Sequence, residues 1–394
     1  MLTSPKSALA LSDIRFSNGV PFSTVEEHEE ALALVRRLAV SAGAAIAVLP
    51  LSGINLETLT GGRSGARVFK LTPFYGTNRQ LQGLPVVVKI AARAQGTREK
   101  ENYERFVRPG LPAACRPDLI GFSRTRAYSG LCYSFIGRDD GAALDTLTDW
   151  LQRGDVLKVD LVLRRIFDLM RDTWYSPTLL RTEADIARRY FNRYFKGQRS
   201  TSETETILRA YAARYFNARY ANGRYLIGEH SFPSPETTLF TSGSKRSYLS
   251  CILHGDLNSD NIVFTDVAEN ATGVALIDFQ KTGRGHVFED LIAVEASIRI
   301  NYARDASLSA IFEKERRIAL GQRPLDGDPY SVAIQKIRDA AFQSFGHLED
   351  KVNYHFAVAA IGLRLMHVVD LSDFARARII ASSLWATKAL TDEL

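Results

Sequence analysis

The alternation of polar and apolar side chains predicts a small group of β-strands in the first third of the chain. Residues 66–71 alternate polar and apolar side chains, which is the period of a strand with one buried face. Residues 54–60 precede them as a first strand, and residues 86–90 and 131–136 are apolar runs of strand length. A helix is expected to begin near residues 96–97. The pattern indicates a small sheet with a helix inserted before its last strand.

The rest of the chain has the spacing of a mainly helical protein. A helix is expected near residues 25–41, before the first strand, and short strands are expected again within residues 248–279. We therefore divide the 394 residues into an N-terminal helical extension (1–53), a sheet lobe (54–140) and a helical lobe (141–394).

Two polar clusters follow short predicted strands of the helical lobe. His-Gly-Asp-Leu-Asn-Ser-Asp-Asn occupies residues 254–261, and Ile-Asp-Phe occupies residues 277–279. Phosphoryl transfer needs one carboxylate at the attacking hydroxyl, and an amide with a second carboxylate to hold Mg²⁺ against nucleotide phosphates. Asn261 follows Asp256 by five residues, as the metal-binding Asn follows the catalytic Asp in protein kinases, and Asp278 follows after a hairpin-length gap. The alternative is that these residues serve only as turn and cap residues.

Both clusters also carry a resemblance to a known family. His-Gly-Asp-Leu-Asn-x-x-Asn-Ile followed by Ile-Asp-Phe resembles the aminoglycoside phosphotransferase and choline kinase family. Gly255, where protein kinases carry Arg, and Gln280, where they carry Gly, are typical of that family. The string over residues 277–286, with Glu-Asp-Leu at residues 289–291, resembles a bacterial branch called the ternary-complex-associated domains, which occur in conflict and signalling operons.

The resemblance implies a two-lobed, protein-kinase-like α+β fold, with a small antiparallel-sheet lobe that binds ATP and a larger, mainly helical lobe. The expected reaction is ATP- and Mg²⁺-dependent transfer of the γ-phosphoryl group to a hydroxyl. Residues 254–261 would form the catalytic loop, in which Asp256 accepts or orients the hydroxyl proton. Asn261 and Asp278 would bind Mg²⁺, with residues 277–280 as the metal loop.

A glycine-rich turn and a lysine in an apolar run fit the nucleotide side of such a site. Gly61, Gly62 and Gly65 lie in the turn between the first two strands, where backbone N–H groups can approach phosphate oxygens without Cβ clashes. Lys89 lies among valines, and an isolated buried ammonium is costly. The resemblance assigns Lys89 to the α- and β-phosphates, paired with a glutamate of the next helix. The alternatives are an ordinary hairpin turn and an edge-strand lysine that reaches solvent.

Helical periodicity selects the partner of that lysine. Three acids of the following helix compete for the role: Glu99, Glu101 and Glu104. Tyr103 and Phe106 are the inward residues, and Glu99 precedes them by four and seven positions, on the same helical face. We therefore expect Glu99 to face Lys89 and the other two acids to face water.

The composition is that of an ordinary globular protein, with 45% hydrophobic and 24% charged residues. Cys115, Cys132 and Cys251 are widely spaced in apolar surroundings, which indicates reduced core residues of a cytoplasmic protein and no disulfide or metal framework. The start of the chain does not have the pattern of a signal peptide, and the longest apolar stretch is too short to span a bilayer.

Arginines and aromatic residues interleave over residues 188–225. Three interpretations stay open: a core with a solvated face, a docking surface for substrate or partner, and nucleic-acid binding through phosphate contacts and base stacking. Tyr190 and Tyr194, and Tyr211 and Tyr215, are four apart, as on the buried face of a helix. The net charge of +6 does not demand a polyanionic partner, so nucleic acid is not expected.

Two other functions would use the same residues. A catalytically silent kinase-like module could sense nucleotide or bind a partner protein of an operon-encoded system. Transfer of AMP is also possible if ATP binds in the reverse orientation. Because all the expected polar groups are present, we favour the phosphotransferase, with the hydroxyl of a small molecule or of a protein docking after residue 142.

Overall fold

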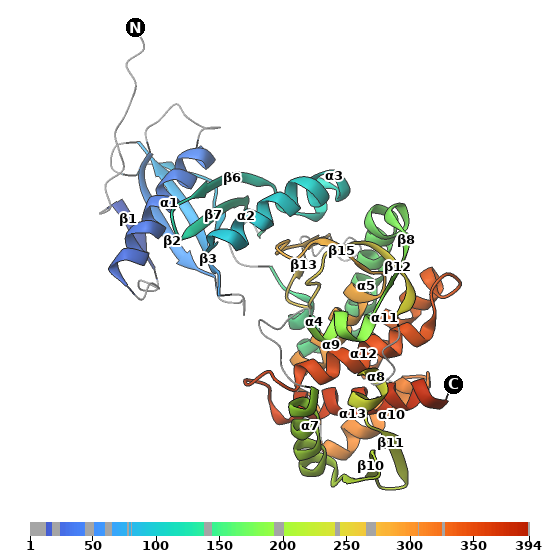
Figure 1. Ribbon diagram of the computed structural model, residues 1–394. Coiled ribbons are helices and arrows are strands. Elements are labelled where there is room, and N and C mark those ends of the chain that lie inside the picture. Colours follow the sequence, from blue (N-terminus) through green and yellow to red (C-terminus); the bar gives the residue numbers. More distant parts are fainter. Residues whose placement is uncertain are drawn as a thin grey trace. The chain divides into compact units, whose positions relative to one another are not determined.

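The chain forms two compact units, which we call the sheet unit and the helical unit. The computed structural model describes residues 13–17, 24–43, 51–59, 65–76, 79, 81–137, 144–192, 201–240, 245–264, 273–305, 307–324 and 328–392. The sheet unit comprises Met1–Leu144 with Thr265–Thr282, and the helical unit comprises Asp145–Phe264 with Gly283–Leu394. Figure 1 shows the first unit mainly in blue and teal and the second mainly in green to red. This confirms the α+β class.

The sheet unit is built on a 7-stranded sheet in the order β1-β2-β3-β5-β7-β6, with β4 paired to β3. Its strands are β1 (Ile14–Phe16), β2 (Leu51–Thr58), β3 (Arg67–Tyr75), β4 (Leu81–Gln82), β5 (Val86–Ala92), β6 (Leu119–Arg124) and β7 (Tyr128–Ser134), and β14 (Val274–Leu276) lies in the same unit. All pairs within this sheet are antiparallel except β1 with β2, which is parallel.

Two helices cover opposite faces of this sheet: α1 (Val25–Gly43) and α2 (Arg93–Asn102). A Cβ atom added to Gly130 of β7 would lie 2.7 Å from Leu38 of α1, and one added to Gly96 of α2 would lie 2.6 Å from Cβ of Ser129. Neighbouring residues of a strand point to opposite faces, so α1 and α2 pack on opposite sides. Residues of β1 and α1 share one apolar core with β2, β3 and β5, and thus belong to the sheet unit.

The helix α2 begins earlier than the sequence suggests. It begins at Arg93, and Thr97 lies inside it, where its hydroxyl donates to the Arg93 carbonyl at 2.8 Å. The expected start at residues 96–97 was wrong because Gly96 permits close packing on β7 and does not break the helix. The helix continues as a π-helix, Tyr103–Val107, and α3 (Arg108–Gly110). The wider π turn moves the inward position from Phe106 to Val107, which is buried with Tyr103.

The helical unit contains most of the helices. They are α4 (Leu147–Arg153), α5 (Val156–Met170), α6 (Ile186–Asn192), α7 (Thr201–Phe216), α8 (Pro235–Phe240), α9 (Glu289–Asn301), α10 (Leu308–Ala319), α11 (Pro329–Phe345), α12 (Lys351–Leu365) and α13 (Asp373–Asp392). Its strands form two small sheets, β8 (Leu180–Ala184) with β12 (Arg246–Leu253) and β15 (Gly283–His286), and β9 (Arg219–Ala221) with β10 (Arg224–Ile227) and β11 (His230–Pro233); β13 (Ile262–Phe264) follows β12.

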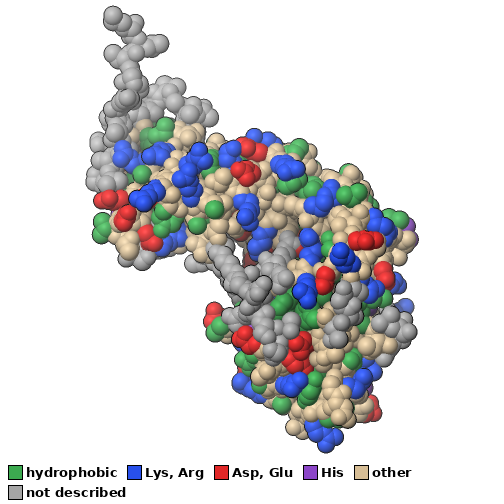
Figure 2. Space-filling view, viewed as in Figure 1, with side chains coloured by type: hydrophobic (Ala, Val, Ile, Leu, Met, Phe, Trp, Pro, Cys, Tyr) green, Lys and Arg blue, Asp and Glu red, His purple; other side chains and the backbone are tan. Residues whose placement is uncertain are grey.

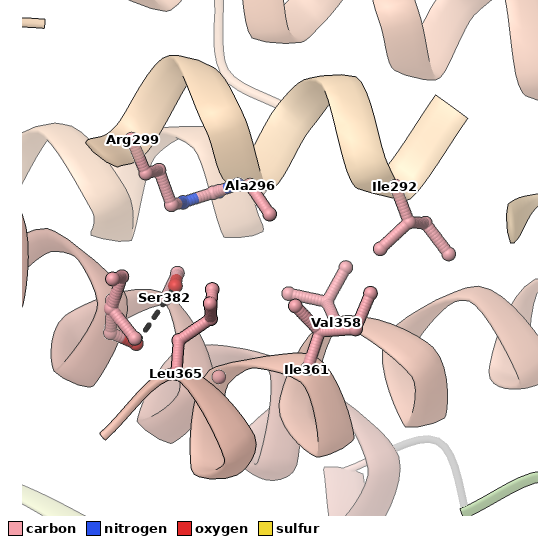
Figure 3. A pocket seen from close by; sticks show the side chains of 9 residues that line it. Ile292, Ala296, Arg299, Val358, Ile361, Leu365 and Ser382 are labelled. Atoms are coloured by element: carbon pink, nitrogen blue, oxygen red, sulfur yellow. Dashed lines mark hydrogen bonds between the residues drawn. The ribbon is translucent and has the colours of Figure 1, made fainter. Parts of the chain in front are cut away.

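The core of this unit lies around α12, whose side chains are buried along nearly its whole length. Gly362 lets α13 approach, because an added Cβ would lie 2.7 Å from Ser383. Figure 3 shows the space left between α9, α12 and α13, with Arg299 and Ser382 among its lining residues. Its volume of about 10 Å³ has room for roughly one water molecule. This cavity is therefore a packing defect and too small for a substrate.

Within the described part of the chain, none of the helices is both long and apolar enough to cross a membrane.

Candidate active site

Lys89 lies between two carboxylates of the sheet unit. Its Nζ is 2.8 Å from Oε2 of Glu99 and 2.7 Å from Oδ1 of Asp278. Lys89 is on β5, Glu99 on α2, and Asp278 follows β14. The pairing of Lys89 with Glu99 expected from helical periodicity is present, whereas Glu101 and Glu104 are exposed. Glu104 pairs instead with Lys100 on the helix surface.

The charges of this cluster are strongly coupled. Burial opposes the charged form of Lys89, but the carboxylates of Glu99 and Asp278 outweigh burial and raise the pKa of Lys89 to about 12. Burial raises the pKa of Glu99, and Lys89 only partly offsets this because the ammonium is shared with Asp278. One buried cation thus faces two acids, a placement typical of functional sites.

Residues at the end of α2 hold the segment that carries Asp278. The ring of Phe279 packs edge-on against Tyr103 with centroids 5.9 Å apart, and Asn102 Nδ2 donates to the Gln280 carbonyl at 2.8 Å. Asp278 itself has a φ of +66°, a left-handed conformation that costs a non-glycine residue free energy. The surrounding contacts therefore maintain a strained backbone at this carboxylate.

No sequence pattern indicates the role of Tyr133 in this cluster. Tyr133 is a buried residue near the end of β7, and its hydroxyl donates to Oε1 of Glu99 at 2.9 Å. Residues 131 and 133 lie on the same face of the strand, but only the packing of α2 on β7 shows that the Tyr133 hydroxyl contacts Glu99.

In the helical unit, residues 254–261 form a tight loop after β12. Gly255 has a φ of +84°, which a side chain would disfavour. Asn261 Nδ2 donates to the Asp256 carbonyl at 2.8 Å, and Oδ1 of Asn258 accepts from the backbone of Asp260 at 2.9 Å. The backbone carbonyl of Asp256 therefore orients the side-chain amide of Asn261.

Helix α9 holds this loop at both ends. Asp290 accepts from the backbone N–H groups of His254 and Gly255, each at 2.8 Å, and from the Tyr175 hydroxyl at 3.1 Å. Two further residues of α9 hold Ser259: Ser297 Oγ accepts from its backbone N–H at 2.8 Å, and Asn301 donates to its Oγ at 3.1 Å. Because α9 presents all three side chains to the loop, it fixes the backbone from His254 to Ser259.

Asp290 lies in the first turn of α9 but does not cap the helix. No side chain caps α9, and the buried carboxylate of Asp290 is used by the loop instead. The sequence signal was an acid directly before an apolar run, which fits either role.

A buried ion-pair network anchors α9 on its other side. Glu295 lies 2.8 Å from Arg338 and 2.7 Å from Arg299, and Arg299 lies 2.9 Å from Glu315. Burial opposes the ionised form of Glu295, but Arg338 and Arg299 outweigh burial and lower its pKa to about 2. These charges join α9 to α10 and α11 and set the position of the helix that holds the loop.

His286 and Arg284 have structural contacts in the helical unit. His286 is fully buried, with Nδ1 2.7 Å from the Tyr190 hydroxyl, and burial lowers its pKa. Arg284 donates to the carbonyls of Thr178 at 2.9 Å and Ser250 at 3.3 Å. Arg284 therefore links β15 to β12, and His286 links β15 to α6.

The segment over residues 188–225 is largely scaffold. Several of its described arginines pair with nearby acids, and several of its described tyrosines are buried; examples are Arg189 with Glu289, Arg209 with Glu205, Arg214 with Asp373, and the buried Tyr190, Tyr215 and Tyr225. Within the helical unit, Figure 1 shows α7, β10 and β11 at the end away from β12 and β13. On the face drawn in Figure 2, basic side chains are scattered among acidic ones. The described part of the segment thus has a buried core and paired surface charges.

The glycine-rich turn is described only in part. Gly61 and Gly62 lie outside the described residues, whereas Gly65 has a φ of +72° with open space where a side chain would be. Lys89, Glu99 and Asp278 belong to the sheet unit, and Asp256 and Asn261 belong to the helical unit.

Several solved structures are similar to this chain. An aminoglycoside phosphotransferase of Streptomyces rimosus is 18% identical, with a TM-score of 0.33 over 78% of this chain and 97% of that one. Ethanolamine kinase of Plasmodium vivax is 12% identical, with a TM-score of 0.36 over 86% and 84%. The GDP complex of aminoglycoside 2'-phosphotransferase-IIIa is 12% identical, with a TM-score of 0.38 over 91% and 99%.

The family match is the decisive comparison. A search of curated proteins finds no match. The model of the family described as "Ternary complex associated domain 9" matches residues 55–210 and 196–348, which together span more than half of the chain. The resemblance stated from residues 277–291 is thereby confirmed, and the structure has the expected α+β class, with a sheet unit and a mainly helical unit. The chain belongs to the ternary complex associated domain 9 family.

Proposed function

We propose that this protein is an ATP- and Mg²⁺-dependent phosphotransferase that moves the γ-phosphoryl group to a hydroxyl of a small molecule or of a protein. The observation that carries the proposal is the buried ammonium of Lys89 held between Glu99 and Asp278 at 2.8 and 2.7 Å. Perturbed charges of this kind gather where a ligand is bound.

The residues present fit the cofactors. Mg²⁺ takes oxygen ligands from carboxylates and substrate phosphates, and Asp278 and Asn261 supply a carboxylate and an amide oxygen. Nδ2 of Asn261 is committed to the Asp256 carbonyl, and none of the residues described donates a hydrogen bond to its Oδ1. The charged Lys89, whose pKa is raised to about 12, suits phosphate oxygens at neutral pH.

Each residue then has a role. Lys89, oriented by Glu99, neutralises charge on the α- and β-phosphates, and the turn containing Gly61, Gly62 and Gly65 covers the phosphates. Asp256 orients the acceptor hydroxyl and takes its proton as the oxygen attacks the γ-phosphorus. The bond from the γ-phosphorus to the bridging oxygen breaks, and ADP leaves with that electron pair. When bound at Asn261 and Asp278, Mg²⁺ supplies charge neutralisation on the β- and γ-phosphates.

The acceptor hydroxyl is not assigned to a segment. Among the described residues of 188–225, Arg209 pairs with Glu205 and Arg214 pairs with Asp373, which argues against an acceptor or nucleic-acid surface at these arginines. Helix α12 is buried along most of its length and forms core, so it offers little surface to an acceptor.

Incubation with γ-labelled and α-labelled ATP tests the proposal, with and without cell extract to supply the acceptor. We expect transfer of the γ label alone, dependent on Mg²⁺ and lost in Asp256→Ala. Transfer of the α label would indicate AMP transfer. Binding of ATP without transfer of either label in any extract would indicate the silent nucleotide-sensing module.

A further inference from the structure

The Tyr133 hydroxyl lies beside the charged cluster of Lys89, Glu99 and Asp278. Lys89 of β5 is opposite Leu131 of β7, and cross-strand partners share a face of the sheet. Tyr133 is two residues beyond Leu131 and thus lies on the same face. Its hydroxyl donates to Oε1 of Glu99 at 2.9 Å, while Oε2 of Glu99 lies 2.8 Å from Lys89 Nζ. Each oxygen of Glu99 therefore has its own partner.

The Tyr133 hydroxyl supplies a hydrogen bond to the buried carboxylate of Glu99. Lys89 is shared between Glu99 and Asp278, so its ammonium does not belong to Glu99 alone. Glu99 is almost fully buried at 1% exposure, and without the hydroxyl its Oε1 would lose a donor in a place that water does not reach. The carboxylate could then turn away from Lys89, which would leave the ammonium on Asp278 alone.

Packing alone does not explain why this residue is a tyrosine. The ring of Tyr133 contacts the ring of Tyr103 edge-on, with centroids 5.9 Å apart. A phenylalanine ring would make the same contact, so the phenolic oxygen is the atom that requires an explanation.

We propose that Tyr133 is a positioning residue for nucleotide binding: its hydroxyl holds the Glu99 carboxylate so that Glu99 keeps Lys89 aimed at the phosphates. This inference rests on the proposed function, since it assumes that Lys89 meets a nucleotide. Tyr133 acts through Glu99 and makes no contact with the reacting atoms.

The chain offers a matched control on the same strand. Tyr128 lies on β7 with its side chain on the other face, and its hydroxyl donates to Oε1 of Glu27 at 3.0 Å. Tyr128→Phe therefore removes the same group from the same strand without touching the Lys89 cluster.

The test is the dissociation constant of MgATP, measured by calorimetry for wild type, Tyr133→Phe, Tyr128→Phe, Glu99→Gln and the double variant Tyr133→Phe/Glu99→Gln. We expect Tyr133→Phe to weaken binding about tenfold, the scale of one hydrogen bond to a charged group. Tyr128→Phe should stay within about twofold of wild type, because surface hydroxyls outside the cluster contribute little. In the Glu99→Gln background, Tyr133→Phe should add almost nothing, because the group through which it acts is already changed.

Two results would overturn the inference. Equal affinities of wild type and Tyr133→Phe would show that the hydroxyl positions nothing, and an undiminished effect in the Glu99→Gln background would show that Tyr133 acts directly or through packing. The same four-member cycle measured as urea unfolding of the nucleotide-free protein keeps the outcome separate from that of the proposed function. If the unfolding cycle shows coupling but the wild-type protein does not bind MgATP, the proposed phosphotransferase function is contradicted. If the wild-type protein binds MgATP but neither cycle shows coupling, only the positioning role of Tyr133 is contradicted.

Discussion

Lys89 shows how a single residue can imply a site. An ammonium among the valines of β5 is unfavourable unless it is paired, and the structure supplies Glu99 and Asp278 as partners. The periodicity of α2 was sufficient to choose Glu99 over Glu101 and Glu104, because only one of the three acids shares a face with the buried Tyr103. The second partner, Asp278, lies far along the sequence, and no local pattern links it to Lys89.

The residue assigned to proton transfer gives the first prediction. Asp256→Ala should lower the rate of γ-phosphoryl transfer by about two orders of magnitude or more while leaving the affinity for MgATP unchanged, since the carboxylate acts at the acceptor. Asp260→Ala is the control, because Asp260 is an exposed acid of the same loop. Initial rates with saturating MgATP measure the effect, and equal rates for wild type and Asp256→Ala would contradict the assignment.

Among the elements of the helical unit, α9 determines the shape of the loop over residues 254–261, the proposed catalytic loop. Asp290, Ser297 and Asn301 each bond to it, and the ion pairs of Glu295 and Arg299 fix the opposite side of the helix. This arrangement makes loop geometry depend on a helix that follows the loop in sequence.

A substitution in α9 tests that dependence. Asp290→Asn removes the charge that two backbone N–H groups and a tyrosine share, so we expect a loss of about 2 kcal/mol in the free energy of unfolding. We also expect transfer to slow about tenfold or more as the loop loosens, with the affinity for MgATP retained. Urea unfolding and initial rates measure the two effects.

Asp350→Ala supplies the comparison for Asp290→Asn. Asp350 caps α12 by accepting from the backbone N–H of Val352 at 2.9 Å, and loss of such a cap costs about 1 kcal/mol. The Asp350 variant should be less stable but should transfer phosphate normally. If both variants slow transfer in proportion to their loss of stability, α9 has no specific role in shaping the loop.

The elements themselves were predictable from pattern to different degrees. The strands of the sheet unit and the helix near residues 25–41 were predicted because burial of one face repeats every two or 3.6 residues. The start of α2 was missed because Gly96 is needed for close packing on Ser129 and was interpreted as a boundary. The buried position is Val107 and not Phe106, and this was missed because no local sequence pattern predicts a π-helix. The contact of Asp290 with the loop over residues 254–261 could not be predicted, because no local pattern shows which loop packs against α9.

For the whole molecule, the buried charges of the helical unit predict sensitivity to acid. Glu295 has a pKa lowered to about 2 by Arg338 and Arg299, below its ordinary value of 4.5. A lowered pKa stabilises the fold at pH values above 4.5, and this contribution is lost as pH falls from 4.5 through 2. We expect the stability gap between wild type and Glu295→Gln to shrink by about 2 kcal/mol between pH 6 and pH 3.

Urea unfolding at a series of pH values measures this gap. Glu313→Gln is the surface control, because Glu313 pairs with Arg316 at 2.7 Å in contact with solvent. Its gap to wild type should change little over the same pH range, since exposed pairs are screened. A gap for Glu295→Gln that stays constant from pH 6 to pH 3 would mean that Glu295 is not ionised in the folded protein.

We claim that Lys89, Asn261 and Asp278 bind nucleotide and magnesium. The melting temperature of the protein, measured with ATP and Mg²⁺ together and with each alone, tests this claim. A ligand that binds the folded protein stabilises it by about 2.7 kcal/mol at a concentration of 100 times its dissociation constant. We predict a clear rise for wild type and Asp260→Asn only when both are present, and a much smaller rise for Asp278→Asn. An unchanged melting temperature of the wild-type protein at millimolar MgATP would contradict the claim.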